Sequence, residues 1–255
     1  MITVLSPAKS LDFEREIQVD QTSEAVFYKE AQSLVKTLKN KPLKDIKNMM
    51  SISDSLTKLN LERFKNWSLD HQNGNAKAAG FVFNGEAYRG LDIHSFSKET
   101  LDFAQKNLRI LSGLYGILKP LDLIHPYRLE MGSKLQWRSK KNLYEFWGDK
   151  ITYEINQELK NHEHKVIVNT ASAEYFKAVR PKALNAEIIT PVFKDAKGGE
   201  YKVIQVYAKK ARGYMAAFIA SNAIEEPEAI KAFDTDGYVF NERLSSGKEW
   251  VFTRG

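Results

Sequence analysis

Apolar side chains recur every three or four positions along several stretches of the chain, a spacing that predicts amphipathic helices. The helices expected from it cover residues 23–40, 43–50, 54–67, 97–108 and 142–161. Shorter apolar and β-branched runs predict strands. These runs are ITVL at 2–5, FVF at 81–83, KVIVN at 165–169, AEIITPVF with EYKVIQVYA at 186–193 and 200–208, and an antiparallel pair within 237–252. The mixture predicts an α+β (mixed α/β) fold, with helices around a mixed sheet.

The stretch from Leu108 to Gly132, LRILSGLYGILKPLDLIHPYRLEMG, combines apolar residues, turn-forming residues and charge more densely than any other. Its two glycines at 113 and 116 predict a tight hairpin, because glycine adopts positive φ without strain. If a helix starts after the hairpin, free N–H groups there can bind an anion. The candidate anion site consists of Gly113, Leu114, Tyr115 and Gly116, reinforced by Lys119 and Arg128. A purely structural turn between two core segments remains the alternative.

Polar residues follow two of the expected strands directly. Ser6 and Lys9 come after ITVL, whereas Lys209, Lys210 and Arg212 follow EYKVIQVYA. In α/β folds, ligands bind beyond the carboxyl ends of the strands. These cations therefore become candidates for one anion-binding cleft shared with Arg128, with a capping Ser6 and solvated lysines as the structural alternative.

The segment HPYRLEMG places Tyr127, Arg128 and Glu130 close together in the sequence. In an extended segment Arg128 and Glu130 share one face. They are either a structural ion pair or an acid/base and anchor pair in a cleft.

Composition narrows the class of protein. The chain has 255 residues, no cysteine and a formal net charge of +6. Residues 222–255 carry seven acidic and four basic side chains, so the excess of basic charge lies in the first 221 residues, as a localised anion-binding face requires. Without cysteine there is no disulfide, thiolate zinc site or cysteine nucleophile, and no signal peptide or long apolar span is evident. We expect one compact cytoplasmic domain over residues 1–255.

Five segments resemble the bacterial YaaA family of peroxide-stress proteins, and together they span nearly the whole chain. They are LSPAK at 5–9, LSGLYGILKPLDLIHPYRLEMG at 111–132, LYEFWGD at 143–149, PKALNAEIITPVF at 181–193 and YAKKARG at 207–213. The resemblance implies a compact fold peculiar to the family and a cytosolic role in limiting oxidative damage, linked to low intracellular free iron.

The resemblance also implies DNA binding through a helix-hairpin-helix element and a basic cleft. Carried onto this sequence, the hairpin is Gly113 to Gly116. The cleft residues are Lys9, Arg128, Lys209, Lys210 and Arg212. No metal site and no cofactor follow from it, so an effect on iron would be indirect.

Two functions remain open from the sequence. The first is a DNA-binding protein that holds the backbone of double-stranded or branched DNA, with no obligate protein partner and no membrane. The second is an enzyme acting on a small phosphorylated or carboxylated substrate in the same cleft, with Ser6, Lys9, Tyr127, Arg128 and Glu130 as candidate catalytic residues. A narrow pocket would favour the second function and an open groove the first.

Overall fold

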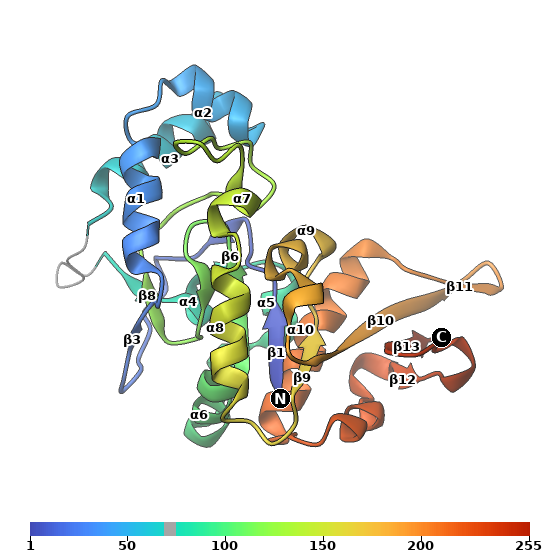
Figure 1. Ribbon diagram of the computed structural model, residues 1–255. Helices are drawn as coiled ribbons and strands as arrows, with labels where there is room; N and C mark the ends of the chain where they lie inside the picture. Colours follow the sequence, from blue (N-terminus) through green and yellow to red (C-terminus); the bar gives the residue numbers. More distant parts are fainter. Residues whose placement is uncertain (69–74) are drawn as a thin grey trace.

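The computed structural model describes residues 1–68 and 75–255, and its centre is one mixed β-sheet (Figure 1). The strand order is β12-β13-β10-β9-β1-β6-β7, with β11 paired to β10. Neighbours from β13 to β6 run parallel, whereas β7, β11 and β12 are antiparallel to their partners. The bounds are β1 Ile2–Leu5, β6 Leu108–Ser112, β7 Gly116–Leu118, β9 Val166–Asn169, β10 Glu187–Lys197, β11 Glu200–Lys202, β12 Val239–Phe240 and β13 Glu249–Arg254. The expected mixed α/β architecture is confirmed.

Helices pack on both sides of this sheet (Figure 1). Their bounds are α1 Tyr28–Leu38, α2 Leu43–Met50, α3 Asp54–Asn66, α4 Ala79–Val82, α5 Glu86–Leu91, α6 Lys98–Asn107, α7 Leu143–Trp147, α8 Lys150–Leu159, α9 Ala173–Phe176 and α10 Gln205–Ser221. Short strands β2 Ser10–Leu11, β3 Ser23–Glu24, β4 Lys77–Ala78, β5 Phe83–Asn84 and β8 Asp122–Ile124 pair outside the main sheet. The expected helix over 142–161 is divided at Gly148, whose φ is +51°. The residues expected as the strand FVF lie in α4 and at the start of β5.

Serine hydroxyls cap the starts of two helices. The Ser97 hydroxyl accepts a hydrogen bond from the Thr100 N–H at the start of α6, and Ser53 accepts one from the Leu56 N–H at the start of α3. Each hydroxyl satisfies a backbone donor that the helix leaves without a partner. These capped helices match the bounds expected from the sequence to within about one residue.

The connections of the sheet create a crevice between β1 and β9. After β1, the chain next enters this sheet as β6, which pairs with one edge of β1. It later forms β9, which pairs with the other edge of β1, and then β10, which pairs with β9. The loops that follow β1 and β9 therefore diverge. In open parallel sheets, ligands bind at such a switch point, beyond the carboxyl ends of the strands.

The segment around the two glycines differs from the sequence-based expectation. Residues Ser112 to Gly116 join β6 to β7, so the element is a β-hairpin and no helix follows Gly116 directly. A β-hairpin therefore stands where the sequence predicted a helix-hairpin-helix element. A pair of glycines permits a tight turn between two helices or between two strands. Here the turn joins strands, because β6 pairs with β1 as well as with β7.

The basic segment at 209–212 also lies in a different element from the expected one. The expected strand 200–208 ends as β11 at Lys202, and Lys209, Lys210 and Arg212 lie within the long helix α10.

Among the described residues no helix is both long and apolar enough to span a bilayer.

Candidate functional site

A pocket of about 430 Å³ lies in the crevice between the loops that follow β1 and β9. We call it the switch-point pocket; its polar lining includes Ser6, Lys9, Asn84, Glu86, Glu130, Thr170, Ser172, Glu174, Lys209 and Arg212. These residues come from the two loops, from the β5–α5 corner, from the loop after β8, and from α9 and α10. The pocket therefore joins segments that lie far apart in the sequence.

Helix α10 brings its cations to this pocket because it crosses α5 at very close range. A Cβ added to Gly213 would lie 1.8 Å from the Ala87 carbonyl oxygen, and one added to Gly90 would lie 2.1 Å from the Lys210 carbonyl oxygen. Only glycine permits such an approach of two backbones. Lys209 and Arg212, three positions apart on one helix face, therefore line the pocket together with residues of α5.

Arg212 is a partly buried cation with no carboxylate partner among the described residues. Burial lowers the pKa of its guanidinium below the ordinary value, and no opposing acidic group contributes. Lys209 is exposed at the rim and also lacks an ion-pair partner in the described part of the chain. Desolvating a cation without a counter-charge is costly, so an anion entering the pocket would relieve that cost.

Two of the three carboxylates of the pocket, Glu86 and Glu130, are paired with cations, and the third, Glu174, accepts a hydrogen bond from the Gly132 N–H. Glu130 contacts Lys9 at 2.8 Å and Arg128 at 2.9 Å, and Glu86 contacts Arg89 at 2.5 Å. Burial acts to raise the pKa of Glu130, but the hydrogen bonds from Lys9 and Arg128 outweigh it, and that pKa lies below its usual value. Neither Lys209 nor Arg212 forms an ion pair with any of these carboxylates in the described residues.

The candidate catalytic residues show no nucleophile with a base. The Ser6 hydroxyl accepts a hydrogen bond from the Ser172 N–H at 2.9 Å and donates to the Ser172 hydroxyl at 3.3 Å. Tyr127 is 4% exposed, its hydroxyl lies 2.6 Å from that of Ser112, and burial raises its pKa. Arg128 and Glu130 form the ion pair that was the structural alternative. An activated serine needs a base within hydrogen-bond reach, and none contacts Ser6 among the described residues.

The hairpin residues do not join the pocket. Leu114 and Tyr115 are fully buried, and their N–H groups both donate to the Ser112 hydroxyl. The Gly113 carbonyl accepts a hydrogen bond from the Trp147 indole, and a Cβ on Gly116 would lie 2.7 Å from the same indole ring. The N–H groups of Leu114 and Tyr115, on which the anion site depended, are thus used inside the protein.

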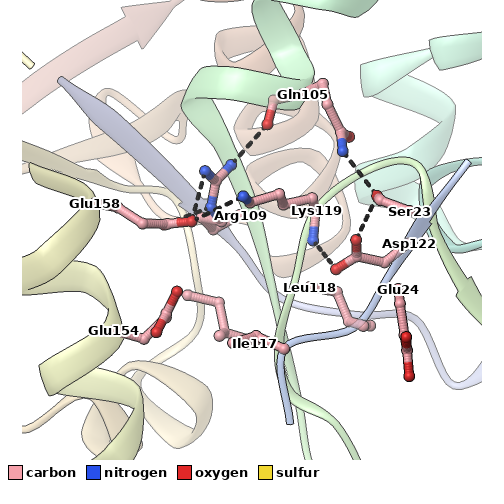
Figure 2. A pocket seen from close by; sticks show the side chains of 11 residues that line it. Ser23, Glu24, Gln105, Arg109, Ile117, Leu118, Lys119, Asp122, Glu154 and Glu158 are labelled. Atoms are coloured by element: carbon pink, nitrogen blue, oxygen red, sulfur yellow. Dashed lines mark hydrogen bonds and ion pairs between the residues drawn. The ribbon is translucent and has the colours of Figure 1, made fainter. Parts of the chain in front are cut away.

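Two further candidate cations point elsewhere. Lys119 lies in a second cavity of about 320 Å³, near the amino end of β6, where it contacts Glu158 at 3.3 Å (Figure 2). The side chain of Lys210 does not line the switch-point pocket; its ammonium lies 5.3 Å from the centre of the Tyr214 ring.

Part of the lining of the second cavity is joined by ion pairs and hydrogen bonds (Figure 2). Arg109, which is 3% exposed, forms two parallel hydrogen bonds with Glu158 at 2.7 and 2.9 Å. Asp122 accepts hydrogen bonds from the Ser23 hydroxyl and the Lys119 N–H, and burial nevertheless raises its pKa. These contacts tie α6, β6 and α8 together and pair the charges of Arg109, Lys119 and Glu158, whereas Glu154, which also lines the cavity, has no ion pair among the described residues.

The sequence analysis missed several lining residues of the switch-point pocket. Thr170, Ser172 and Glu174 follow KVIVN directly, so the rule that pointed to Ser6 and Lys9 applies equally to them. Asn84 and Glu86 carried no comparable signal, because only the crossing of α5 with α10 brings them to the pocket. No group of three or more histidine, aspartate or glutamate side chains that could hold a metal ion occurs in residues 1–68 and 75–255.

Comparison with known proteins agrees with the motifs in the sequence. Residues 1–244 match the family described as peroxide stress protein YaaA. A UPF0246 protein of Saccharophagus degradans is 51% identical over 254 residues, covering 100% of this chain and 99% of the relative. UPF0246 proteins of Teredinibacter turnerae and Aliivibrio fischeri are 50% and 49% identical, covering 100% of this chain and 99% and 98% of the relatives. The chain therefore belongs to the YaaA family of peroxide stress proteins.

Proposed function

We propose that this protein binds DNA during the peroxide stress response, with backbone phosphate held at the switch-point pocket. The observation that carries the proposal is the pair of cations on α10, Lys209 and Arg212, which line the pocket and have no ion-pair partner among the described residues, whereas Glu86 and Glu130 are already paired with other cations. A phosphate oxygen supplies the counter-charge that the partly buried Arg212 lacks. The lowering of free iron that the family resemblance implies is, in this proposal, an indirect effect of DNA binding.

The buried hairpin has no part in the proposal. Backbone N–H groups can grip a phosphate only when they face solvent, whereas those of Leu114 and Tyr115 bond to Ser112. The positive charge on α10 is the better-supported element.

An enzymatic function is the second candidate, and one observation favours it. A volume of about 430 Å³ falls within the range of roughly 300–1,000 Å³ that small-molecule sites occupy. Against it, the hydrogen bonds of the Ser6 hydroxyl within residues 1–68 and 75–255 go to Ser172 and to no base. Binding of an anion is therefore the function that the described geometry supports best.

The test is the affinity for a labelled short DNA duplex, measured by fluorescence anisotropy across a salt series. Arg212→Ala and Lys209→Ala should each weaken binding and reduce the slope of log affinity against log salt by about 0.9, the value for one lost phosphate contact. Arg243→Ala and Lys197→Ala are the matched controls, because both side chains are exposed and lie outside the pocket. Wild-type affinity in the two pocket variants would contradict the proposal.

A further inference from the structure

The size of the switch-point pocket sets a limit on what part of DNA can enter it. Its volume is about 430 Å³, and it is lined by the loops after β1, β8 and β9 and by helices α5, α9 and α10. A DNA duplex is wider than its major groove, which alone measures about 12 Å, whereas a compact cavity of this volume is narrower than that, so a paired double helix can touch only the rim. One nucleotide, by contrast, is of the size that such pockets accommodate.

The polar groups divide the pocket into two chemically different parts. Lys209 and Arg212 on α10 supply positive charge for a phosphate. Asn84 and Glu86, at the β5–α5 corner, and Glu174 on α9 supply amide and carboxylate groups, which hydrogen-bond to the amino groups of a base or to a sugar hydroxyl.

Two of these groups retain unused hydrogen-bonding capacity. The side chain of Asn84 is exposed and has no hydrogen-bond partner among the described residues. Glu174 accepts a bond from the Gly132 N–H through Oε1, which leaves Oε2 without a partner in the described part of the chain. The pocket therefore offers an anionic ligand both charge neutralisation and polar recognition.

We infer that the switch-point pocket takes one unpaired nucleotide of DNA, with its phosphate at Lys209 and Arg212 and its base or sugar at Asn84 and Glu174. This inference rests on the proposed DNA binding and specifies which part of the DNA is recognised. Turning a paired nucleotide out of the stack of a duplex costs a few kcal/mol. DNA in which a nucleotide is already unpaired avoids that cost and is the preferred ligand.

The experiment compares a fully paired duplex with the same duplex carrying one unpaired adenosine nucleotide, using the full chain and anisotropy at fixed salt. The bulged duplex should bind at least about tenfold more tightly, which corresponds to about 1.4 kcal/mol of the avoided unpairing cost. Free deoxyadenosine monophosphate should compete with it, and deoxyadenosine without phosphate should not.

Variants separate the two parts of the pocket. Arg212→Ala should weaken binding of both duplexes. Asn84→Ala should reduce only the preference for the bulged duplex, because Asn84 is exposed and its loss removes no packing. Arg243→Ala serves as the control and should leave both affinities and the preference unchanged.

The outcomes distinguish this inference from the proposed function. Equal affinities for the paired and bulged duplexes, without competition by the monophosphate, overturn the inference and leave DNA binding intact. Failure to bind either duplex overturns both, and binding of the monophosphate in that case identifies a free nucleotide as the ligand. A preference that persists unchanged in Asn84→Ala overturns the assigned recognition group.

Discussion

Arg212 shows how a single residue links the stability of the protein to its ligand. Its guanidinium is partly buried on α10, burial lowers its pKa, and no carboxylate in the described residues neutralises it. Arg109 is more deeply buried, but its charge is paired, because it donates two hydrogen bonds to the Glu158 carboxylate. The charge of Arg109 is neutralised by its partner, whereas the unpaired charge of Arg212 lowers the stability of the fold and attracts anions.

Replacing Arg212 by methionine tests this cost directly. The Arg212→Met variant should raise the free energy of unfolding by about 0.5–2 kcal/mol, because an apolar side chain of similar length removes an unpaired charge. Urea unfolding monitored by circular dichroism measures the change. Arg243→Met at an exposed position should alter stability by less than about 0.5 kcal/mol, and a destabilised Arg212→Met protein would contradict the unpaired-charge interpretation.

At the residue scale, the sequence located several side chains of the pocket but not their partners. The strand-end rule selected Ser6 and Lys9, which do lie beyond the carboxyl end of β1. It could not show that Glu130 engages Lys9, because that contact joins residues from two distant segments. It also could not separate Lys209 from Lys210, since the direction of each side chain depends on the helix that carries them.

The helix α10 is the element that decides where the basic side chains lie. In the sequence, YKVIQVYA is a short β-branched run, and such a run does not distinguish a strand from a buried helix. The pattern that does distinguish them continues further, because the buried residues Ala208, Ala211, Met215 and Ile219 recur at helical spacing. The two-glycine hairpin is the converse case, because its turn is the same between helices or between strands.

The glycine contact between α5 and α10 should be sensitive to one methyl group. Gly213→Ala places a Cβ 1.8 Å from the Ala87 carbonyl oxygen, so the helices must separate. We expect a loss of about 1–3 kcal/mol of stability or more, as for other overpacked sites, together with weaker DNA binding because Lys209 and Arg212 move from the pocket wall.

Thermal unfolding and the anisotropy assay measure these two effects on the Gly213→Ala variant. Ser221→Ala, at an exposed position of the same helix, is the control and should change stability by less than about 0.5 kcal/mol. Wild-type stability in Gly213→Ala would show that the two helices are not held at this distance.

At the scale of the whole molecule, the amino terminus is tied to the far end of α8. The Met1 amino group lies 3.2 Å from Nδ1 of His162, next to the start of β1. Burial, followed by the positive amino terminus, lowers the pKa of His162 to about 4. Protonation of this histidine in acid therefore opposes the folded state of the entire sheet.

The sign of this effect sets a pH window. The folded state binds a proton at His162 only near pH 4, whereas the unfolded chain binds it near the ordinary histidine value of 6.5. The free energy of unfolding should therefore fall as the pH drops from 6.5 towards 4. Urea unfolding at about pH 7 and about pH 5 should show a smaller loss for His162→Gln than for the wild type, and equal losses would contradict the assignment.

The sequence by itself determined the mixed α/β class, most helices, the β1 and β9 strands and the family, because these depend on local periodicity, capping and motifs read along the chain. Tertiary structure alone decided that the two-glycine hairpin is buried, that Lys119 and Lys210 point away from the pocket, and that Arg212 has no counter-charge in the described residues. The physical reason is that solvent exposure and ion pairing depend on which distant segments meet. In this protein the order of the strands and the close crossing of α5 with α10 determine which distant segments come into contact.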